Sequence, residues 1–374
     1  MRIGIDARNL VPDLTGIGRY VFEMSRHLAA MGHELVLYMP ENPSSSLPKW
    51  PRTTVRIGNY AGGIRRLVWG QLVLPKLASA DDLDIFWGPA HRLPLFLDQS
   101  IPRVVTIHDL VWMNAPSTMR LQTWLGERVL MKPAISGADR VVADSSSTAE
   151  AVKAAFPKSA GKISVVHCGL TSLSNGLAKE ALSAFTTMHR IDRRYALFVG
   201  TLEPRKNLCR ILEAYSHLSI DTRENLLLII AGGQGWRLGD LRRLITRLGI
   251  ELTVRLTGYV TDDELAQLYA NAHFLVMPSI YEGFGFPIIE ANAMGIPVLT
   301  SNTSSMPEIA GNAALLVDPH DVSALTSAMW TLANDENLHR HLVNKTRLNA
   351  ARFDWCKSAA DLTKVFKEAV RMRR

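Results

Sequence analysis

Residues 279–299 read SIYEGFGFPIIEANAMGIPVL and combine a Gly-rich loop, a helix and the start of an apolar strand. Gly283 and Gly285 allow the backbone to approach a ligand closely, and Pro287 suits the first turn of the helix. The amino terminus of that helix offers N–H groups and a positive dipole end to a diphosphate. The stretch therefore predicts an anion-binding loop and helix within a parallel α/β sheet.

Two carboxylates lie within this stretch. Glu282 stands in the Gly-rich loop, and Glu290 stands about one turn into the helix. Glu290 can point back at the same pocket and accept two hydrogen bonds from a vicinal diol such as a ribose. Glu282 is placed to meet a sugar, because a carboxylate accepts hydrogen bonds from several hydroxyls. The alternative is an exposed loop followed by a solvent-facing glutamate.

The same alternation of short apolar runs and helical stretches extends over the rest of the chain in two series. The first series has expected strands at 2–7, 34–39, 84–88, 103–109, 140–144 and 162–167. The second has expected strands at 195–200, 225–233, 253–258, 273–279, 296–301 and 313–318. This pattern predicts an α/β fold of two Rossmann-like, doubly wound domains that face each other across a deep cleft. The loops after the strands should line that cleft.

The division of the chain follows from these two series. We expect residues 1–175 to form the first domain and residues 176–354 to form the second. Residues 171–190 carry no strand signal and suit a linker with a short helix. The end of the chain, from Phe353 on, has the pattern of an amphipathic helix, and residues 355–374 should complete the first domain.

The composition is that of a folded protein, with 47% hydrophobic and 21% charged residues. At 374 residues, the chain exceeds what one hydrophobic core usually serves. Cys168, Cys209 and Cys356 lie far apart and lack metal-binding spacing, which indicates a reducing compartment. Neither a secretory signal nor an apolar run long enough to span a membrane is recognisable, so we expect a cytoplasmic protein.

The net charge of +7 is unevenly distributed: residues 1–180 hold 20 Lys and Arg against 15 Asp and Glu, and residues 181–374 hold 22 against 20. A basic first half, with the apolar and basic stretches 64–78 and 120–134, suggests peripheral contact with the anionic inner face of the cell membrane. Both stretches are equally compatible with core helices. Nucleic acid is not an expected partner, because no basic run interleaved with aromatic residues is present.

The segment FVGTLEPRKNL, residues 198–208, runs from a strand into a loop with Arg205 and Lys206, before a helix that Asn207 is expected to cap. Two cations at a helix amino terminus oppose the helix dipole, which favours a functional reason for them. A nucleoside diphosphate gains charge as it leaves a sugar, and paired cations stabilise that state more than the ground state. The alternative is a basic helix terminus on the surface.

His108 and Asp109 end the expected strand 103–109. A histidine at this position can reach a donor hydroxyl or the reacting centre. Alternatively, the histidine is structural and Asp109 fixes its tautomer.

The loop DLTGIGRY, residues 13–20, is a weaker candidate. Its glycines open a helix, and its backbone amides would face the donor phosphate or the acceptor. Gly16 is the donor-binding candidate here. The acceptor-binding candidates are Gly18, Arg19, Tyr20 and Asp109.

A metal site is not expected. The sequence Asp82-Leu83-Asp84 precedes a strand, at the end away from the ligand, and we interpret it as a solvated turn. Cationic side chains and helix amides would do the work of a divalent ion. No cofactor is expected other than the nucleotide-sugar donor.

At these residues the chain resembles the retaining glycosyltransferases of family 4, which have the GT-B fold of two facing Rossmann-like domains. The resemblance spans nearly the whole chain. It rests on Gly16, His108-Asp109, ADSSSTAE at 143–150, EPRKN at 203–207 and EGFGFPIIE at 282–290. The segments GIDARNL, TGIGRY and VGTLEPRKNL also look like those of bacterial mannosyltransferases of polysaccharide and O-antigen assembly.

The resemblance implies roles for the candidate residues. Lys206 would bind the donor diphosphate, Glu282 the transferred sugar, and Glu290 the nucleotide ribose. His108 would bind a sugar hydroxyl near the reaction centre. Donor contacts in the Gly-rich loop are implied for Gly283, Phe284, Gly285 and Phe286.

One departure from the family pattern concerns the second cation. Many relatives carry an arginine directly after the strand's glycine, where this chain has Thr201. Either Arg205 supplies the second cation, or the site has only Lys206.

The implied reaction retains the anomeric configuration by front-face displacement, with the leaving phosphate as base. GDP-mannose is the expected donor, and a polyprenyl-diphosphate-linked or growing oligosaccharide of O-antigen or lipopolysaccharide type is the expected acceptor. One alternative is a GT-B nucleotide-sugar 2-epimerase, which would need further acidic and basic residues that we do not identify. Another is a non-catalytic protein that binds sugar nucleotides.

Overall fold

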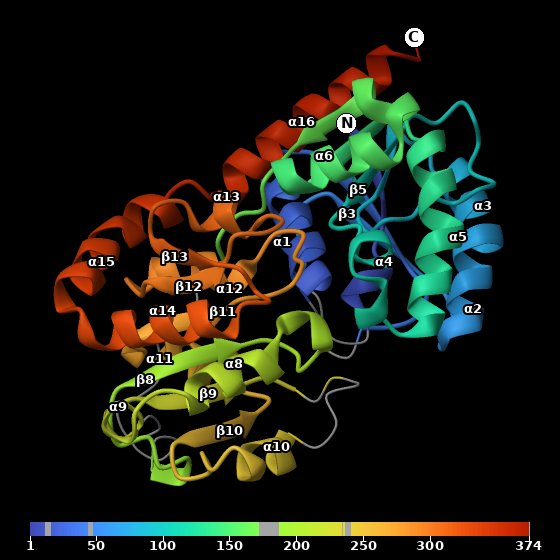
Figure 1. Cartoon of the computed structure of the whole chain (residues 1–374). Coiled ribbons are helices and arrows are strands. Elements are labelled where there is room, and N and C mark those ends of the chain that lie inside the picture. The colour runs from blue at the N-terminus through green and yellow to red at the C-terminus, as the bar shows by residue number, and fades with distance from the viewer. Residues whose placement is uncertain (12–15, 44–47, 172–186, 234, 236–240, 374) are drawn as a thin grey trace. The chain divides into compact units, whose positions relative to one another are not determined.

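The computed structural model describes residues 1–11, 16–43, 48–171, 187–233, 235 and 241–373 (Figure 1). The chain forms two compact domains: residues 1–169 with 354–374, and residues 170–353. The expected boundary at residue 175 lies outside the described residues. The first of the two segments that form the first domain ends at Gly169. This glycine packs so tightly on Trp355 that a Cβ there would lie 2.4 Å from the indole ring.

The first domain contains a seven-stranded parallel sheet. Its strands, in spatial order, are β3 (Thr53–Ile57), β2 (Glu34–Met39), β1 (Arg2–Asp6), β4 (Ile85–Gly88), β5 (Arg103–Ile107), β6 (Arg140–Ala143) and β7 (Ile163–Val165). The sequence predicted all of these strands except β3. Strand β3 lies at the edge of the sheet, and its side chains are half-buried or exposed, so it lacks the apolar run of the central strands.

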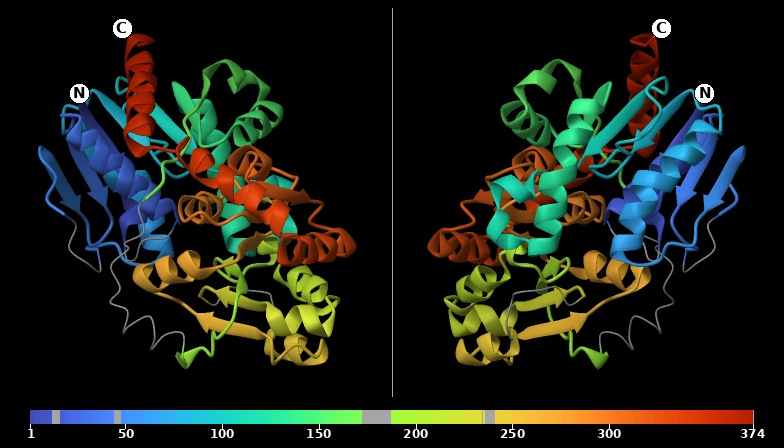
Figure 2. Two further views of the ribbon diagram at one scale, coloured as in Figure 1. Left: turned by 90° about the vertical axis from the view of Figure 1, so that its left-hand side faces the viewer. Right: turned by 90° about the vertical axis from the view of Figure 1, so that its right-hand side faces the viewer.

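Helices cover both faces of this sheet. One core cluster joins a face of the sheet to the π turn Trp69–Val73, α3 (Leu74–Ser79), α5 (Leu121–Gly137) and α6 (Ser146–Ala155), and the short helix α2 (Gly63–Val68) precedes the π turn. On the other face, α1 (Gly16–Ala30) contacts α16 (Trp355–Arg371), which returns from the end of the chain (Figure 2). Trp87 of β4 lies between them, with ring centroids 5.9 Å from both Tyr20 and Phe366. The amphipathic carboxyl-terminal helix is thus confirmed.

The second domain contains a six-stranded parallel sheet. Its strands, in spatial order, are β10 (Val254–Gly258), β9 (Leu227–Ala231), β8 (Tyr195–Val199), β11 (Phe274–Met277), β12 (Val298–Ser301) and β13 (Ala314–Val317). All six were predicted. A core cluster joins one face of the sheet to α8 (Leu208–Ser216), α10 (Leu241–Arg247) and α14 (Val322–Asn334).

The described part of the second domain contains five further helices. They are α9 (Ile220–Asn225), α11 (Asp262–Asn271), α12 (Phe286–Ala293), α13 (Met306–Ala310) and α15 (Glu336–Ala350). Because all strands of this sheet run parallel, the loops that follow β8, β9, β11 and β12 meet at one edge. No helix in the described part of the chain is both long enough and apolar enough to cross a membrane.

Candidate active site

The loop after β8 presents the two cations. Pro204–Lys206 form a short 3-10 turn, and Asn207 follows with a left-handed φ of 64° before α8 begins. The expected capping role of the Asn207 side chain is wrong. Its Nδ2 instead donates to the carbonyls of Pro278 (3.0 Å) and Pro319 (2.6 Å), so Asn207 ties this loop to the loops after β11 and β13.

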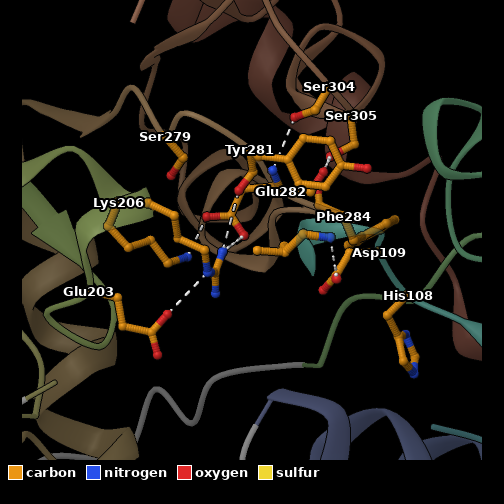
Figure 3. Close-up of polar contacts among 12 residues, drawn as sticks. His108, Asp109, Glu203, Lys206, Ser279, Tyr281, Glu282, Phe284, Ser304 and Ser305 are labelled. Carbon is orange, nitrogen blue, oxygen red and sulfur yellow. Dashed lines mark hydrogen bonds and ion pairs between the residues drawn. The ribbon is translucent and has the colours of Figure 1, made fainter. Parts of the chain in front are cut away.

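Lys206, Arg205 and Glu282 meet at this edge of the sheet (Figure 3). Lys206 Nζ lies 2.6 Å from Glu282 Oε1, and Arg205 Nη1 lies 2.5 Å from Glu282 Oε2. Arg205 also bonds through Nε to Glu203 Oε2 at 3.0 Å. The structure therefore brings together both predicted cations and the predicted sugar-binding acid. Thr201 is exposed, and Arg205 is the second cation beside Glu282.

Burial and charge oppose each other in this cluster. Burial alone raises the pKa of Glu282, but the neighbouring Arg205 and Lys206 outweigh it and lower the pKa to about 2. Burial lowers the pKa of Lys206, whereas Glu282 opposes that change. Glu282 is therefore a carboxylate at neutral pH, and it can accept hydrogen bonds but donate none.

The loop that carries Glu282 is fixed by two serines after β12. The backbone N–H of Glu282 donates to Ser304 Oγ at 3.1 Å. Ser305 Oγ lies 3.0 Å from the carbonyl oxygen of Glu282 and 2.8 Å from that of Phe284. A further backbone bond, from Ile280 N to Arg205 O at 2.8 Å, joins this loop to the cation loop. These serines were not predicted, and their only signal in the sequence is their position just after a strand.

Helix α12 begins where the sequence predicted it, with Pro287 in its first turn. Gly285 precedes the helix with φ 109°, which a residue with a side chain rarely adopts. Glu290 is buried in this helix, and its Oε2 accepts a hydrogen bond of 2.9 Å from the Tyr269 hydroxyl of α11. Tyr269 was not anticipated, because it comes from another helix.

The loops after β8 and β9 touch at the same edge. Gly232 has φ 156°, and a Cβ at this residue would lie 2.0 Å from the carbonyl oxygen of Gly200. Gly200 N donates to Ala231 O at 3.0 Å, and Leu202 N donates to Gly233 O at 3.1 Å. Glycine at position 232 thus permits the close approach of the two loops.

His108 follows β5 in the first domain and is buried. Its Nδ1 lies 3.0 Å from Asp144 Oδ2, and its Nε2 lies 2.7 Å from Pro89 O. The expectation that Asp109 fixes the ring is wrong, because Asp109 Oδ1 instead accepts from Val111 N at 3.0 Å. Asp144 holds the ring because β6 lies beside β5 in the sheet.

The loop before α1 is described from Gly16 onward, and residues 12–15 lie outside the described part. Gly16 is exposed, Gly18 is buried and Arg19 is half-buried. Tyr20 is fully buried, and its ring meets that of His108 edge to face at 4.7 Å. The Tyr20 ring therefore belongs to the domain core, and contact of this residue with the acceptor stays a prediction for its backbone.

Asp82 and Asp84 are exposed and directly precede β4. As predicted, they lie at the amino end of that strand, away from the end where ligands bind. Asp84 Oδ2 accepts a hydrogen bond from Arg2 N at 2.7 Å. Among the described residues, no group of three or more His, Cys, Asp or Glu side chains has the arrangement of a metal site.

Comparisons with family models cover both domains. Residues 14–171 match the model of Glycosyltransferase Family 4, and residues 185–349 match that of Glycosyl transferases group 1. Two parallel-sheet Rossmann-like domains with this cation and carboxylate site define a glycosyltransferase of the GT-B fold. The chain belongs to the glycosyltransferases, with a family 4 first domain and a group 1 second domain.

Characterised relatives include mannosyltransferases. O-antigen chain mannosyltransferase B of Escherichia coli is 29% identical over 362 residues, which are 91% of this chain and 93% of the relative. O-antigen chain mannosyltransferase RfbU of Salmonella typhimurium is 27% identical over 270 residues, covering 71% and 70%.

Solved structures share the fold at lower identity. Sucrose-phosphate synthase from Thermosynechococcus elongatus aligns with a TM-score of 0.78, at 21% identity and 98% coverage of both chains. WaaG, a glycosyltransferase involved in lipopolysaccharide biosynthesis, aligns with a TM-score of 0.74, at 16% identity, over 98% of this chain and 99% of its own.

Proposed function

We propose that this glycosyltransferase retains the anomeric configuration and transfers mannose from GDP-mannose to a lipid-linked or growing oligosaccharide of O-antigen type. The contact of Lys206 and Arg205 with Glu282 carries this proposal. Cations for a diphosphate and an acceptor for sugar hydroxyls are the groups that a nucleotide sugar requires at its reacting end.

In the proposed reaction, the bond between the anomeric carbon and the diphosphate oxygen breaks, and its electron pair leaves with the diphosphate. Lys206 and Arg205 stabilise that developing charge, so no metal ion is required. The acceptor hydroxyl forms the new bond on the same face, and its proton passes to the leaving phosphate. Glu282 holds hydroxyls of the transferred sugar, a role supported by its ionised state.

Further contacts of the donor are proposed for the Gly-rich loop and α12. Glu290 binds the ribose, and Gly283 to Phe286 approach the diphosphate with their backbone. His108 lies near a hydroxyl of the transferred sugar, and Gly16 approaches the donor. Mannose and an O-antigen acceptor are supported by the names of the Escherichia coli and Salmonella relatives.

The test is transfer by the purified chain from a panel of nucleotide sugars to a polyprenyl-diphosphate-linked acceptor. GDP-mannose should give product of retained configuration, and Glu282→Gln should lose at least about 100-fold in kcat. Glu251→Gln, at an exposed glutamate of the same domain, is the matched control and should stay active. Conversion of the donor to its epimer without acceptor would replace this proposal with the epimerase alternative.

We further propose that the protein is cytoplasmic and that its first domain contacts anionic membrane through the outer face of α2, α3 and α5. Helices α3 and α5 and the π turn between α2 and α3 pack through their inner sides into the same core cluster. Their outer sides expose large apolar residues, which are Ile64, Leu67, Val68, Leu72, Leu121, Leu125 and Val129. Exposed cations accompany them, namely Arg65, Lys76, Arg128 and Lys132.

Flotation with vesicles that contain anionic lipid tests this surface. The wild-type chain should float at low salt, and Leu125→Glu with Val129→Glu should stay in the soluble fraction. Leu348→Glu is the control, because Leu348 is 78% exposed but lies in the second domain. Wild-type protein that does not float would exclude the proposed contact.

A further inference from the structure

The segment GIDARNL, residues 4–10, contributes to the resemblance but has no role in the proposed reaction. In the structure it ends β1 and enters a 3-10 turn, Arg8–Leu10. The chain passes through β2 and β3 on one side of β1 before β4 begins the other side of the sheet. Parallel α/β sheets bind ligands at such a switch point, beyond the carboxyl ends of the strands. Arg8 therefore stands where a ligand of the first domain is expected.

Three neighbours hold the Arg8 guanidinium in place. Asp6 is buried, and Arg8 Nε lies 2.8 Å from its Oδ1, while Arg8 Nη2 lies 2.6 Å from its Oδ2. The guanidinium carbon lies 5.6 Å from the ring centroid of Trp69, which is fully buried. Gly70 is so close that a Cβ there would lie 2.2 Å from Nη2 and 2.9 Å from Nη1. The guanidinium is therefore fixed before any ligand binds.

This arrangement leaves one edge of the guanidinium to a ligand. An arginine has five N–H donors, and Asp6 takes the one on Nε and one on Nη2. Among the described residues, Nη1 has no hydrogen-bond partner, and it is not one of their buried, unpartnered atoms. Only 13% of the Arg8 side chain is exposed. Nη1 therefore reaches solvent and offers two N–H groups from a side chain that is otherwise enclosed.

The Asp6 carboxylate decides which ligand suits this edge. Its ion pair with Arg8, at 2.6 Å, compensates the charge of the guanidinium, so an approaching anion would meet both charges. A sugar hydroxyl carries no charge and needs only an N–H group that donates to its oxygen, which Nη1 supplies. The chemistry of the pair therefore favours the hydroxyls of a sugar over a phosphate group.

We propose that Arg8 determines acceptor specificity: its Nη1 donates hydrogen bonds to hydroxyls of the acceptor sugar, and Asp6 and Gly70 are positioning residues that hold it. The inference rests on the proposed function, in which an oligosaccharide is the acceptor and the cations and Glu282 of the second domain take the donor. Arg8 thus complements Glu282, because Glu282 accepts hydrogen bonds from the transferred sugar and Arg8 donates them to the acceptor.

Initial rates of the full chain, with donor and acceptor varied separately, test this role. Arg8→Met should lower kcat/KM for the acceptor about 10- to 100-fold and leave the KM for the donor within about twofold. Arg56→Met is the matched control, because Arg56 pairs with another buried carboxylate of the same domain, Asp81, at 2.6 Å. Both variants leave a buried aspartate without its arginine, so a merely structural effect would appear in both. An equal fall in both, or no fall in Arg8→Met, would overturn the proposal.

Gly70→Ala displaces the guanidinium without removing a charge. Because the new methyl group would lie 2.2 Å from Nη2, Arg8 has to move, and kcat/KM for the acceptor should fall as in Arg8→Met. Gly63→Ala is the control, since a Cβ at Gly63 meets no atom within 4 Å. An acceptor constant in Gly70→Ala equal to that of the control would contradict the positioning of Arg8.

Two acceptors separate sugar from phosphate: the same oligosaccharide on a polyprenyl diphosphate and on an uncharged alkyl chain. The loss in Arg8→Met should be equal with both, and a loss confined to the diphosphate acceptor would overturn the proposal. Calorimetric titration with the alkyl-linked acceptor, without donor, gives a readout independent of transfer: Arg8→Met should bind it about tenfold more weakly, and Arg56→Met should not. If the wild-type chain transfers no mannose from GDP-mannose, the proposed function fails. If the wild type and Arg8→Met bind the acceptor equally, the role of Arg8 fails alone.

Discussion

Lys206 Nζ lies 2.6 Å from Glu282 Oε1 in the second domain, and each residue is only 7% exposed. A buried cation and a buried carboxylate each need an oppositely charged partner, and here Lys206 and Glu282 are partners of each other. A diphosphate that takes over Lys206 would release Glu282 for sugar hydroxyls. In the proposed reaction, the pair would thus link recognition of the leaving group to recognition of the sugar.

This pairing predicts opposite effects of Glu282→Gln on donor chemistry and on product binding. The substitution leaves Arg205 and Lys206 without their carboxylate, so GDP should bind about tenfold more tightly, while transfer is lost. The free energy of unfolding without ligand should fall by about 3–5 kcal/mol, because a buried pair is broken. Calorimetric titration with GDP and urea denaturation measure the two effects. GDP affinity equal to or below that of the wild type would refute the pairing argument.

The two cations can be compared through Lys206→Met and Arg205→Met. Each should reduce kcat/KM about 100-fold, because each substitution removes a positive charge that would stabilise the leaving group. Arg210→Met is the control, since Arg210 lies in the following helix, α8, and donates to Asn207 Oδ1 at 2.9 Å. If Arg205→Met behaves like the control, only Lys206 of these two cations is functional. Arg205 then does not replace the arginine that many relatives carry at the position of Thr201.

The hydrogen bond between Tyr269 and Glu290 predicts a selective effect on donor binding. Tyr269→Phe removes one buried hydrogen bond to the carboxylate, worth about 1 kcal/mol, so the Kd of GDP should rise about fivefold. Tyr195→Phe is the matched control, because the Tyr195 hydroxyl donates to Leu268 O at 2.8 Å instead. The two variants should lose similar stability, and weaker GDP binding in both would remove the proposed ribose role of Glu290.

Acid should destabilise the second domain through a stacked histidine pair. His273 and His339 lie parallel, with ring centroids 4.0 Å apart. Burial, followed by the charges of His339 and Arg194, lowers the pKa of His273 from 6.5 to about 4. In this pH range the unfolded chain therefore binds a proton at His273 that the folded chain does not bind. The free energy of unfolding consequently falls as the pH drops from 6.5 toward 4.

Urea denaturation at pH 7.5 and pH 5 measures this loss. His273→Gln should show a smaller difference between the two pH values than the wild type. His320→Gln, at an exposed histidine of the same domain, should behave like the wild type. An unchanged pH dependence in His273→Gln would assign the acid sensitivity to other groups.

The sheets were predictable because their central strands are continuous apolar runs between loops. Strand β3 escaped prediction, since its side chains at the sheet edge are half-buried or exposed and two of them are threonines. The site residues in the Gly-rich loop were predictable because glycine, proline and glutamate have local backbone reasons to occur there. Their partners were not, because the choice of Asp144 over Asp109 for His108 depends on which strand lies alongside β5.

The same limit explains the error at Asn207 and the unexpected burial of the Tyr20 ring. An asparagine before a helix is a good local cap, but here its amide reaches carbonyls 71 and 112 residues away. Tyr20 follows a Gly-bearing loop, which suggested a ligand contact. Its burial depends on Trp355, whose ring centroid lies 6.0 Å away, and on Trp87. Contacts with residues so far away in the sequence cannot be predicted from the local sequence.

Helix α16 has a consequence for the order in which the two domains acquire their native state during synthesis. Leu362 and Phe366 of this helix are fully buried in the first domain, although the ribosome adds them after the whole second domain. The second domain, residues 170–353, leaves the ribosome complete while the first still lacks one layer of its core. The domain translated second is therefore free to fold first, and a nascent chain that stops before Trp355 would carry a finished second domain attached to an unfinished first one.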